Sequence, residues 1–441
     1  MKHNPGDKVK IYTDDETYEG IIMPSIELTG KDTLILKLEK NGYNIGFDKK
    51  KIKKVELVQK YKSEPSKEKK IVNNKDLPTI SILHTGGTIA SKLDYQTGGV
   101  GSSFTPEEIL NMFPELKSMV NIRSRLVKNM WSQDMRFSHY NILAKEILKE
   151  IKAGSQGIII THGTDTIHYS SSALSFILED LSKPVLIVGA QRSSDRGSSD
   201  AFINLLNAVY FIINSDFSEV GVCMHASSND NDCWIHSGTK VRKFHSSRRD
   251  AFQPVNQKVW AAVDYQKNKI KYFRKGYNKK SDSLPKLKLF DEKIKVGLIK
   301  QRTNMFGDEF LFYKNYDGLV IEATGLACLP ISEIDDLTTE SGKIKKAIKK
   351  IIDEGCVVVN APQTIFGRIN MNVYEDQRNA QNMGVLGSMN DMTPATTYIK
   401  LAWLLSNYKK EDISELIIKN LRGEINDKLT DDLFMKWDWN K

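Results

Sequence analysis

The segment that most constrains the fold is a short, unbroken apolar run at residues 158–160 that leads directly into Thr161-His162-Gly163-Thr164-Asp165-Thr166. A run of this kind, bounded by turn residues, is typical of a buried parallel strand. Residues 170–178 continue as a predicted helix, so Thr164 and Asp165 are expected near its positive N-terminus. Because open α/β sheets bind ligands at the carboxyl ends of their strands, this turn is a candidate ligand site. The alternative is that both residues only cap the helix.

A second segment, residues 79–90, has the same design, because a β-like run ends in Thr85-Gly86-Gly87-Thr88. Paired glycines at a strand-to-helix turn allow the backbone to approach a ligand closely. The spacing matches neither the GxGxxG dinucleotide motif nor the GxxxxGK[ST] phosphate loop, which argues against those ligands. Two threonines on such turns indicate hydroxyl chemistry between neighbouring strands. The backbone N–H groups of Gly86 and Gly87 are candidate oxyanion donors.

Strands that alternate with helices extend this pattern over the central and C-terminal parts of the chain. Such alternation predicts a doubly wound, mainly parallel sheet. The expected strands are residues 185–189, 219–224, 296–300, 317–323 and 356–360, and the expected helices are residues 138–152, 201–213 and 341–354.

The segments TGGTIA at 85–90 and HGTDT at 162–166 closely resemble the two signature segments of the L-asparaginase/glutaminase family. A third match, Trp131-Ser132-Gln133-Asp134, lies between them, and the resemblance runs from about Thr79 to near Leu405. It implies two α/β domains and an amide hydrolase with a threonine nucleophile.

The resemblance also implies roles for single residues. Thr88 and Thr164 are the two hydroxyls, and Asp165 and Lys240 form the charged pair of a proton relay behind Thr164. Tyr95, on a Gly- and Ser-rich loop at residues 91–104, assists the first threonine. A lysine beside a carboxylate is held protonated, whereas a general base must be neutral, so burial has to counter the pairing. The sequence leaves open the protonation state of Lys240 and which threonine is acylated first.

Further positions are implied for substrate binding. Ser132 and Gln133 bind the α-carboxylate and α-amino end of the substrate, and Gly87 lies beside it. Homodimeric asparaginases supply an acidic residue across the subunit interface. Glu375, within residues 370–378, is the candidate for that cross-subunit acid.

The first 60 residues predict a separate binding or docking module. Alternating segments at 8–12, 18–23, 33–38, 44–47 and 54–58, separated by turn residues, predict a five-stranded, SH3-like β-barrel. Residues 49–54 read KKKIKK. We favour an edge strand protected by lysines, and the alternative is a patch that faces phosphates.

Composition limits the compartment and the cofactors. The four cysteines (Cys223, Cys233, Cys328 and Cys356) lack CxxC or metal-ligand spacing, which is typical of reduced thiols in a cytoplasmic protein without a metal site. No apolar run approaches membrane-spanning length. The net charge of +9 is compatible with an RNA-related partner but does not require one.

The C-terminal half contains two polar connections. Residues 266–295 carry 11 Lys and Arg against 3 acidic residues and predict a basic linker, and a helical tail ends near Phe434, Trp437 and Trp439. The predicted domains are the β-barrel module (1–60), a linker (61–76), the large α/β domain (77–265), the basic linker (266–295), the small α/β domain (296–410) and the tail (411–441).

The added module, basic segment and longer tail resemble the asparaginase-like subunits of archaeal glutamyl-tRNA(Gln) amidotransferases. The resemblance implies a glutaminase that releases ammonia from glutamine or asparagine, in a homodimer within an α2β2 complex. A partner, the E subunit, binds tRNA(Gln) and uses ATP and Mg, so no cofactor is expected in this chain. The alternatives are a free-standing L-asparaginase and a non-catalytic scaffold for an RNA-binding partner.

Overall fold

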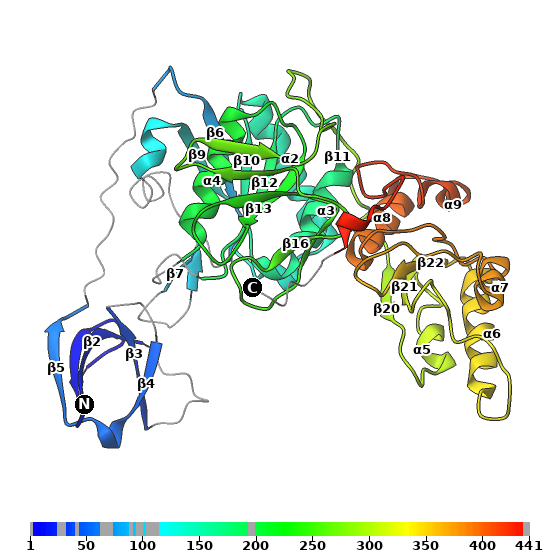
Figure 1. The fold of residues 1–441 in the computed structure, drawn as a ribbon, viewed down its shortest axis with the longest axis horizontal. Coiled ribbons are helices and arrows are strands. Elements are labelled where there is room, and N and C mark those ends of the chain that lie inside the picture. The colour runs from blue at the N-terminus through cyan, green and yellow to red at the C-terminus, as the bar shows by residue number, and fades with distance from the viewer. Residues whose placement is uncertain are drawn as a thin grey trace.

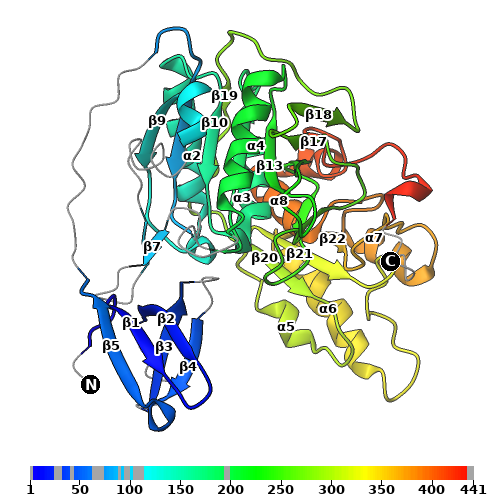
Figure 2. The same ribbon diagram turned by 60° about the vertical axis from the view of Figure 1, so that its left-hand side comes forward.

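The computed structural model describes residues 3–23, 32–39, 44–61, 74–87, 91–93, 100–102, 114–192 and 199–434. Figures 1 and 2 show a small all-β module that stands apart at the N-terminal end, a large α/β domain, and a smaller α/β domain beside it. The predicted fold class, two α/β domains preceded by a small all-β module, is confirmed.

The N-terminal module is a five-stranded antiparallel sheet. Its strands are β1 (Lys8–Tyr12), β2 (Thr17–Ile22), β3 (Thr33–Leu38), β4 (Asn44–Asp48) and β5 (Lys54–Gln59), in the order β4-β3-β2-β1-β5. All five predicted strands are present. Their period of two places Val9, Ile11 and Leu36 in a small core. Within the run at 49–54, Lys49–Lys51 forms a 3-10 turn between β4 and β5, so only Lys54 belongs to an edge strand.

The large domain is built on an eight-stranded mixed sheet. Its strands are β6 (Thr79–His84), β9 (Asn121–Leu126), β10 (Ile158–Thr161), β12 (Val185–Val188), β13 (Val220–His225), β14 (Cys233–Ser237), β17 (Ala261–Asp264) and β18 (Lys269–Tyr272). The order is β18-β17-β14-β13-β12-β10-β6-β9. The five strands from β13 to β9 run parallel, whereas β14, β17 and β18 pair antiparallel. The carboxyl ends of β6 and β10 therefore lie side by side.

Helices cover both faces of this sheet. They are α2 (Phe137–Lys152), α3 (Ile167–Ile177) and α4 (Ala201–Asn214), and α8 (Pro394–Asn407) of the small domain packs against the outer side of α3. Side chains of α2, α3 and α8 share a core with Ile158 and Ile160, whereas α4 packs with Ile159 on the opposite face. The two faces of the buried strand β10 thus explain its unbroken apolar run.

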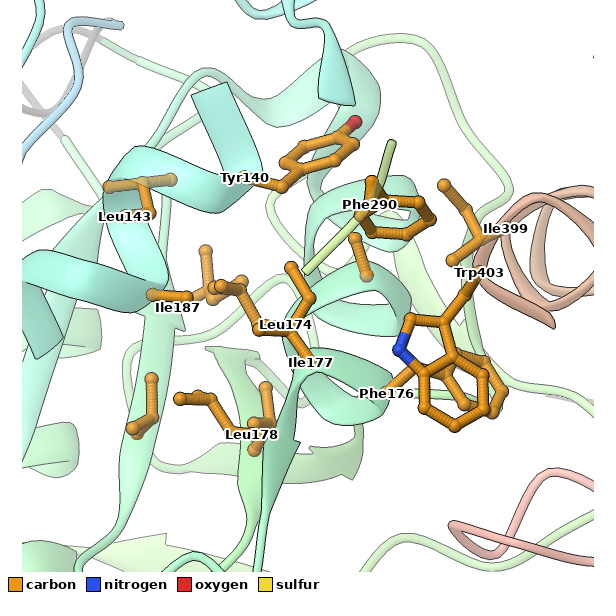
Figure 3. Close-up of a cluster of buried hydrophobic side chains, with 14 of the residues drawn as sticks. Tyr140, Leu143, Leu174, Phe176, Ile177, Leu178, Ile187, Phe290, Ile399 and Trp403 are labelled. Atoms are coloured by element: carbon orange, nitrogen blue, oxygen red, sulfur yellow. The ribbon is translucent and has the colours of Figure 1, made fainter. Parts of the chain in front are cut away.

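The first of these cores also joins the two α/β domains. Figure 3 shows Phe176 and Ile177 of α3 beside Ile399 and Trp403 of α8, with Phe290 nearby. The rings of Phe176 and Trp403 lie 5.4 Å apart. The shared core fixes the smaller domain against α3, the helix that follows the HGTDT turn.

The small domain contains three parallel strands in the order β20-β21-β22. The strands are β20 (Val296–Lys300), β21 (Gly318–Ala323) and β22 (Val357–Pro362), and the helices are α5 (Gly307–Leu311), α6 (Thr339–Asp353) and α7 (Glu375–Met383). The predicted strands and helix of this domain are confirmed within a few residues.

In the described part of the chain, three short antiparallel pairs lie outside the main sheets. They are β7 (Ser91–Leu93) with β8 (Val100–Ser102), β11 (Leu178–Glu179) with β19 (Lys286–Leu287), and β15 (Val241–Lys243) with β16 (Phe252–Pro254). The β15–β16 hairpin is separate from the eight-stranded sheet, so its position depends on other contacts.

The basic segment 266–295 is only partly a linker, which corrects the prediction. Residues 269–272 form β18 at the edge of the main sheet, and β19 pairs with β11. The aromatic side chains explain this attachment, because Tyr277 packs against Phe217 and Trp260, and Arg274 lies 3.6 Å from the centre of the Trp260 ring.

The predicted helical tail is also wrong in part. Only η7 (Lys410–Asp412), α9 (Ile413–Leu416) and η8 (Asp431–Leu433) are helical among its described residues. The Glu424 carboxylate accepts from the backbone N–H groups of Leu421 and Arg422, and Gly423 has φ +77°, so the chain turns instead of continuing a helix. Phe434 is exposed, and Trp437 and Trp439 lie outside the described residues. No helix in the described part of the chain has the length and apolarity that crossing a membrane requires.

Candidate active site

The two glycine-bearing turns meet at the carboxyl edge of the parallel strands. β6 and β10 are neighbours in register, with His84 opposite Thr161. The Thr85 N–H and hydroxyl groups both donate to the Thr161 carbonyl, at 3.1 and 2.9 Å. The predicted convergence of the two segments is therefore confirmed as far as Gly87. Thr88 and Tyr95 lie outside the described residues, and their roles stay predictions.

Close backbone contact explains the glycines in these turns. Gly86 and Gly87 have φ values of +103° and +84°, in the left-handed region that favours glycine. A Cβ atom on Gly87 would lie 2.5 Å from Gly163 N, and one on Gly163 would lie 2.8 Å from Ser132 Cβ. Three turns, which hold Gly87, Gly163 and Ser132, thus touch one another and cannot accept larger residues without rearrangement.

Thr164 and Asp165 share one lysine partner. Thr164 begins the 3-10 turn η6 (Thr164–Thr166) directly after β10 and Gly163. Lys243, the last residue of β15, donates through Nζ to Thr164 Oγ1 at 2.8 Å and to Asp165 Oδ1 at 2.8 Å. The side chain of Lys243 is 11% exposed and that of Asp165 is 69% exposed. A hydroxyl, an ammonium and a carboxylate in contact at an accessible turn can pass a proton between them.

Lys240 does not occupy this position, so the predicted Lys240–Asp165 pair is wrong. Its Nζ atom lies 3.2 Å from Asp391 Oδ1 and donates to the Asp391 carbonyl at 3.0 Å. Burial lowers the pKa of Lys240 to about 8, although the Asp391 carboxylate raises it. Burial therefore lowers the pKa of Lys240 against the effect of its carboxylate partner, as expected for a lysine that acts as a base. This lysine, however, is paired with Asp391 and does not contact Thr164.

Lys243 is the residue that reasoning from sequence missed. Lys240 and Lys243 belong to one basic run with Arg242, and residue type does not distinguish the two lysines. One signal could have separated them, because alternation along a strand puts Lys243 on the same face as Val241, which is 1% exposed. A lysine on that face must lie against the protein and needs a polar partner there.

Two buried histidines support the turns rather than the chemistry. His162 donates from Nδ1 to the Gly163 carbonyl at 2.6 Å, which leaves Nε2 to accept from the Ser170 hydroxyl at 2.8 Å. His84 lies 2.8 Å from both Thr161 Oγ1 and Ser124 Oγ. Burial lowers the pKa of each imidazole to about 4, so both are neutral at physiological pH.

Ser132 and Gln133 lie beside the same turns. Both belong to η5 (Ser132–Asp134), and the Thr166 hydroxyl donates to the Ser132 carbonyl at 2.7 Å. Ser132 is buried and Gln133 is exposed. They line a cavity of about 530 Å³ between the two α/β domains, together with Thr166 and Tyr398. Thr164, Asp165 and Lys243 are absent from its lining, so this cavity adjoins their cluster without containing it.

Glu375 lies at the first position of α7 and is exposed. Figures 1 and 2 place α7 on the outer side of the small domain, away from β10 and α3. Within one chain Glu375 is thus not brought to the Thr164 turn, and its role as a cross-subunit acid stays a prediction.

Comparison with known families covers nearly the whole chain. Residues 79–277 match the family described as Asparaginase, N-terminal, and residues 295–417 match the Glutaminase/Asparaginase C-terminal domain. Residues 3–58 match the GatD N-terminal domain. The fold and the threonine-bearing turns thus define an asparaginase-type amide hydrolase preceded by an additional β module.

Individual relatives narrow this class. The D subunit of the glutamyl-tRNA(Gln) amidotransferase of Pyrococcus abyssi is 41% identical over 433 residues, covering 96% of this chain and 95% of the relative. The corresponding D subunit from Methanococcus maripaludis is 39% identical, with 96% and 98% covered. The chain belongs to the family of glutamyl-tRNA(Gln) amidotransferase D subunits.

Solved asparaginase structures match most of this chain and agree with the assignment of its asparaginase-like fold. A thermostable L-asparaginase from Thermococcus kodakarensis has a TM-score of 0.69 and 26% identity, covering 79% of this chain and 100% of that structure. L-asparaginase I from Vibrio cholerae has a TM-score of 0.66 and 25% identity, with 79% and 99% covered. These asparaginases therefore account for less of the chain than the D subunits do.

Proposed function

We propose that this chain is the glutaminase component of a tRNA-dependent amidotransferase. It hydrolyses the side-chain amide of glutamine or asparagine and supplies the ammonia that converts Glu-tRNA(Gln) to Gln-tRNA(Gln). The contact of Lys243 with both Thr164 and Asp165 carries the chemical part of this proposal. Its placement in an amidotransferase rests on the D-subunit relatives, which match the chain from the β module to the small domain.

The proposed reaction is acyl transfer through threonine. One threonine oxygen, of Thr88 or Thr164, attacks the carbonyl carbon of the amide, and its proton passes to the departing nitrogen through Lys243 and Asp165. The carbon–nitrogen bond breaks and ammonia leaves. Water then attacks the acyl-threonine ester, which releases glutamate or aspartate and restores the hydroxyl. The N–H groups of the Gly86-Gly87 turn stabilise the oxyanion in this proposal.

The remaining assignments concern substrate and assembly. Ser132, Gln133 and Gly87 bind the amino acid end of the substrate, and Tyr95 assists Thr88 from its loop. Two copies of the chain pair so that Glu375 of one completes the site of the other. The exposure of Glu375 on the small domain supports such a contact. A partner, the E subunit, binds tRNA(Gln) and uses ATP and Mg²⁺ to activate the glutamyl group in an α2β2 complex.

A free-standing L-asparaginase is the second candidate. The solved asparaginases cover 79% of this chain, whereas the D subunits cover 96% and the β module has a match of its own. A module of this kind adds nothing to amide hydrolysis but is suited to docking. These observations favour the amidotransferase.

Glutaminase assays of the chain alone, with its partner, and with its partner and charged tRNA test the proposal. We expect Thr164→Ala to lose glutamine-dependent formation of Gln-tRNA by orders of magnitude while ammonium salts still support it, because the partner's chemistry does not use Thr164. High activity that is indifferent to the partner would instead identify a free-standing amidase. An assembled complex that ammonium cannot rescue would contradict the division of labour, and inactivity towards every amide would favour the scaffold.

A further inference from the structure

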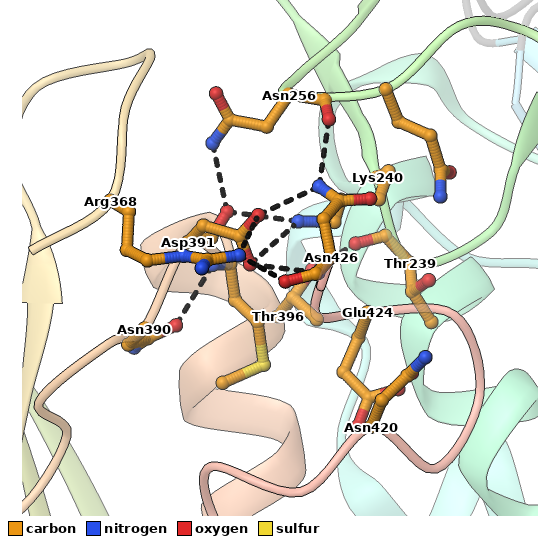
Figure 4. A network of polar contacts seen from close by, with 12 residues as sticks. Thr239, Lys240, Asn256, Arg368, Asn390, Asp391, Thr396, Asn420, Glu424 and Asn426 are labelled. Atoms are coloured by element: carbon orange, nitrogen blue, oxygen red, sulfur yellow. Dashed lines mark hydrogen bonds and ion pairs between the residues drawn. The ribbon is translucent and has the colours of Figure 1, made fainter. Parts of the chain in front are cut away.

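Lys240 lies three residues before Lys243, but its ammonium extends into a buried polar network between the two α/β domains (Figure 4). Its partner Asp391 directly precedes Met392 and Thr393, the N-cap residue of α8. The Lys240 and Asp391 side chains are 1% and 0% exposed. An enclosed pair of this kind is held in a narrow range of positions, because separation would leave two charges without solvent.

The C-terminal segment completes the network. Asn426 donates through Nδ2 to Asp391 Oδ2 and to the Asn256 carbonyl, at 2.7 Å each. Asn256 in turn donates to the Asp391 carbonyl at 2.9 Å, and Arg368 donates to the Asn426 carbonyl. Segments that are far apart in sequence therefore converge on the Asp391 carboxylate and carbonyl.

These contacts hold the hairpin that carries Lys243. Lys240 directly precedes β15, and its carbonyl accepts from the Val255 N–H at 2.7 Å, next to β16. The Thr239 carbonyl accepts from the Thr396 hydroxyl of α8 at 2.9 Å. β15 and β16 do not belong to the eight-stranded sheet, and the base of the hairpin is held by Ser171 of α3, which donates to the Gly238 carbonyl, together with the attachment of Thr239 and Lys240 to the small domain.

We propose that Lys240 is a positioning residue whose ion pair with Asp391 holds the β15–β16 hairpin so that Lys243 reaches Thr164 and Asp165. The inference rests on the proposed function and deepens it. The small domain and the C-terminal segment thus influence the proton relay through the position of Lys243. Neither of them contributes Thr164, Asp165 or Lys243 itself. Displacing a reacting group by about 1 Å can cost about a hundredfold in rate, so the anchor has a measurable effect.

The titration of Lys240 offers a readout specific to this pair. The charged groups that face it are Asp391 and Glu424, which raise its pKa, and Arg368, which lowers it, while burial has the largest effect and brings the pKa to about 8. Lys240 is thus charged and paired below this pH and neutral above it. The contribution of the pair to activity is present at lower pH and declines as the pH rises through the pKa.

The chain offers a matched control in a second buried pair. Lys400 lies 2.7 Å from Glu424, both side chains are 0% exposed, and the pair also joins α8 to the C-terminal segment. Lys400 precedes no active-site strand. We expect Lys240→Met to lower kcat for glutamine by roughly ten- to a hundredfold at about pH 6.5 with little change in KM. Lys400→Met frees Glu424, which also faces Lys240, but keeps the Lys240–Asp391 pair, so its loss of kcat should be clearly smaller.

The pH series decides between positioning and general destabilisation. The ratio of wild-type to Lys240→Met activity should fall by about pH 9.5, where wild-type Lys240 is neutral and keeps only its hydrogen bonds to Asp391. A ratio that does not change with pH, or equal losses in the two variants, would overturn the inference. Asn426→Ala removes a hydrogen bond to Asp391 but keeps both charges of the pair, so we expect a smaller loss of activity than in Lys240→Met. This variant replaces Lys240→Met in the test if Lys240→Met does not fold.

A second measurement does not depend on activity. Reductive methylation with formaldehyde and cyanoborohydride, followed by mass spectrometry, reports how readily Lys243 Nζ is reached. We expect Lys243 to react faster in Lys240→Met than in wild type or Lys400→Met, because the hairpin is released. Equal rates would overturn the inference. A wild-type complex without glutaminase activity would refute the proposed function, while the methylation rates would still decide the role of Lys240.

Discussion

Lys240 and Lys243 lie three residues apart and each pairs with an aspartate, yet their surroundings differ sharply. The Lys240–Asp391 pair is enclosed between two domains, with both side chains essentially inaccessible. The Lys243–Asp165 pair lies at the end of a parallel sheet, and its carboxylate is 69% exposed. The comparison teaches that burial, rather than residue type, separates a lysine that holds the structure from one that can exchange a proton with a bound substrate.

Removing each carboxylate in turn gives the largest contrast. Asp391→Asn leaves the Lys240 ammonium buried without its counter-charge, so we expect the free energy of unfolding to fall by about 3–5 kcal/mol. Asp165→Asn removes an exposed partner and should cost less than about 1 kcal/mol. Urea titrations followed by circular dichroism measure both. Equal losses of stability would mean that the two pairs are not enclosed to different degrees.

Asp165→Asn should impair catalysis strongly although it costs little stability, in contrast to Asp391→Asn. Asp165→Asn removes the carboxylate that shares Lys243 with Thr164, and we expect kcat/KM for glutamine to fall by about a hundredfold, or about 2.7 kcal/mol of transition-state stabilisation. Steady-state assays of the complex measure it. Near-normal turnover in a stable Asp165→Asn protein would remove this carboxylate from the relay.

Two glycines with similar backbone angles, one at the active-site turns and one remote from them, separate the effect of backbone strain from that of close contact. Gly87 (φ +84°) and Gly154 (φ +87°) carry the same conformational strain when replaced, but a Cβ on Gly87 would lie 2.5 Å from Gly163 N while one on Gly154 meets nothing within 4 Å. We expect each alanine variant to lose about 1 kcal/mol from the backbone, and only Gly87→Ala to lose amide hydrolysis, by about tenfold or more. Loss of activity in Gly154→Ala would show that strain alone is responsible.

The lysines of the N-terminal module should have the smallest effect. Lys50 and Lys51 lie on an exposed 3-10 turn of the N-terminal β module, and both ribbon views show this module remote from β10 and α3 (Figures 1 and 2). We expect Lys50→Glu with Lys51→Glu to leave glutamine hydrolysis by the isolated chain within about twofold, because surface charges at this separation are screened. Any change in the salt dependence of tRNA binding by the complex would then report on a phosphate-facing patch. A strong loss of basal hydrolysis would contradict a separate docking role.

Local sequence predicted most of the framework because each element carries its own pattern. β10 has an apolar run that fits burial on two faces, and β1 of the module alternates between buried and half-buried residues as a strand with one buried face should. The meeting of the Gly87 and Gly163 turns also followed from sequence, since carboxyl ends of adjacent parallel strands share one edge, whereas the position of Ser132 beside them was implied by the family resemblance. The strand patterns depend on residues that are close along the chain, and the order of the parallel strands then brings the two turns together.

The errors concern contacts between distant residues. Lys240 pairs with Asp391, which lies about 150 positions later in the chain, and no sequence pattern near Lys240 predicts that partner. Tyr277 attaches the basic segment to Phe217 and Trp260, although its charge pattern is that of a linker. The tail is held to the body by Glu424, which pairs with Lys400, and by Asn426, which donates to Asp391, and these contacts replace the helix that its composition favours. Tertiary contacts of this kind override local propensity.

The most direct test of the account compares Lys243→Met with Lys240→Met in the assembled complex. In Lys243→Met the rate of glutamine hydrolysis should fall by about a thousandfold or more, because the proton relay is removed, and this loss should be the same at every pH. At about pH 7 the loss in Lys240→Met should be far smaller. Thermal melting should show the opposite order, with the greater loss of stability in Lys240→Met. A nearly active Lys243→Met protein beside an inactive Lys240→Met protein would contradict the assignment of the catalytic lysine.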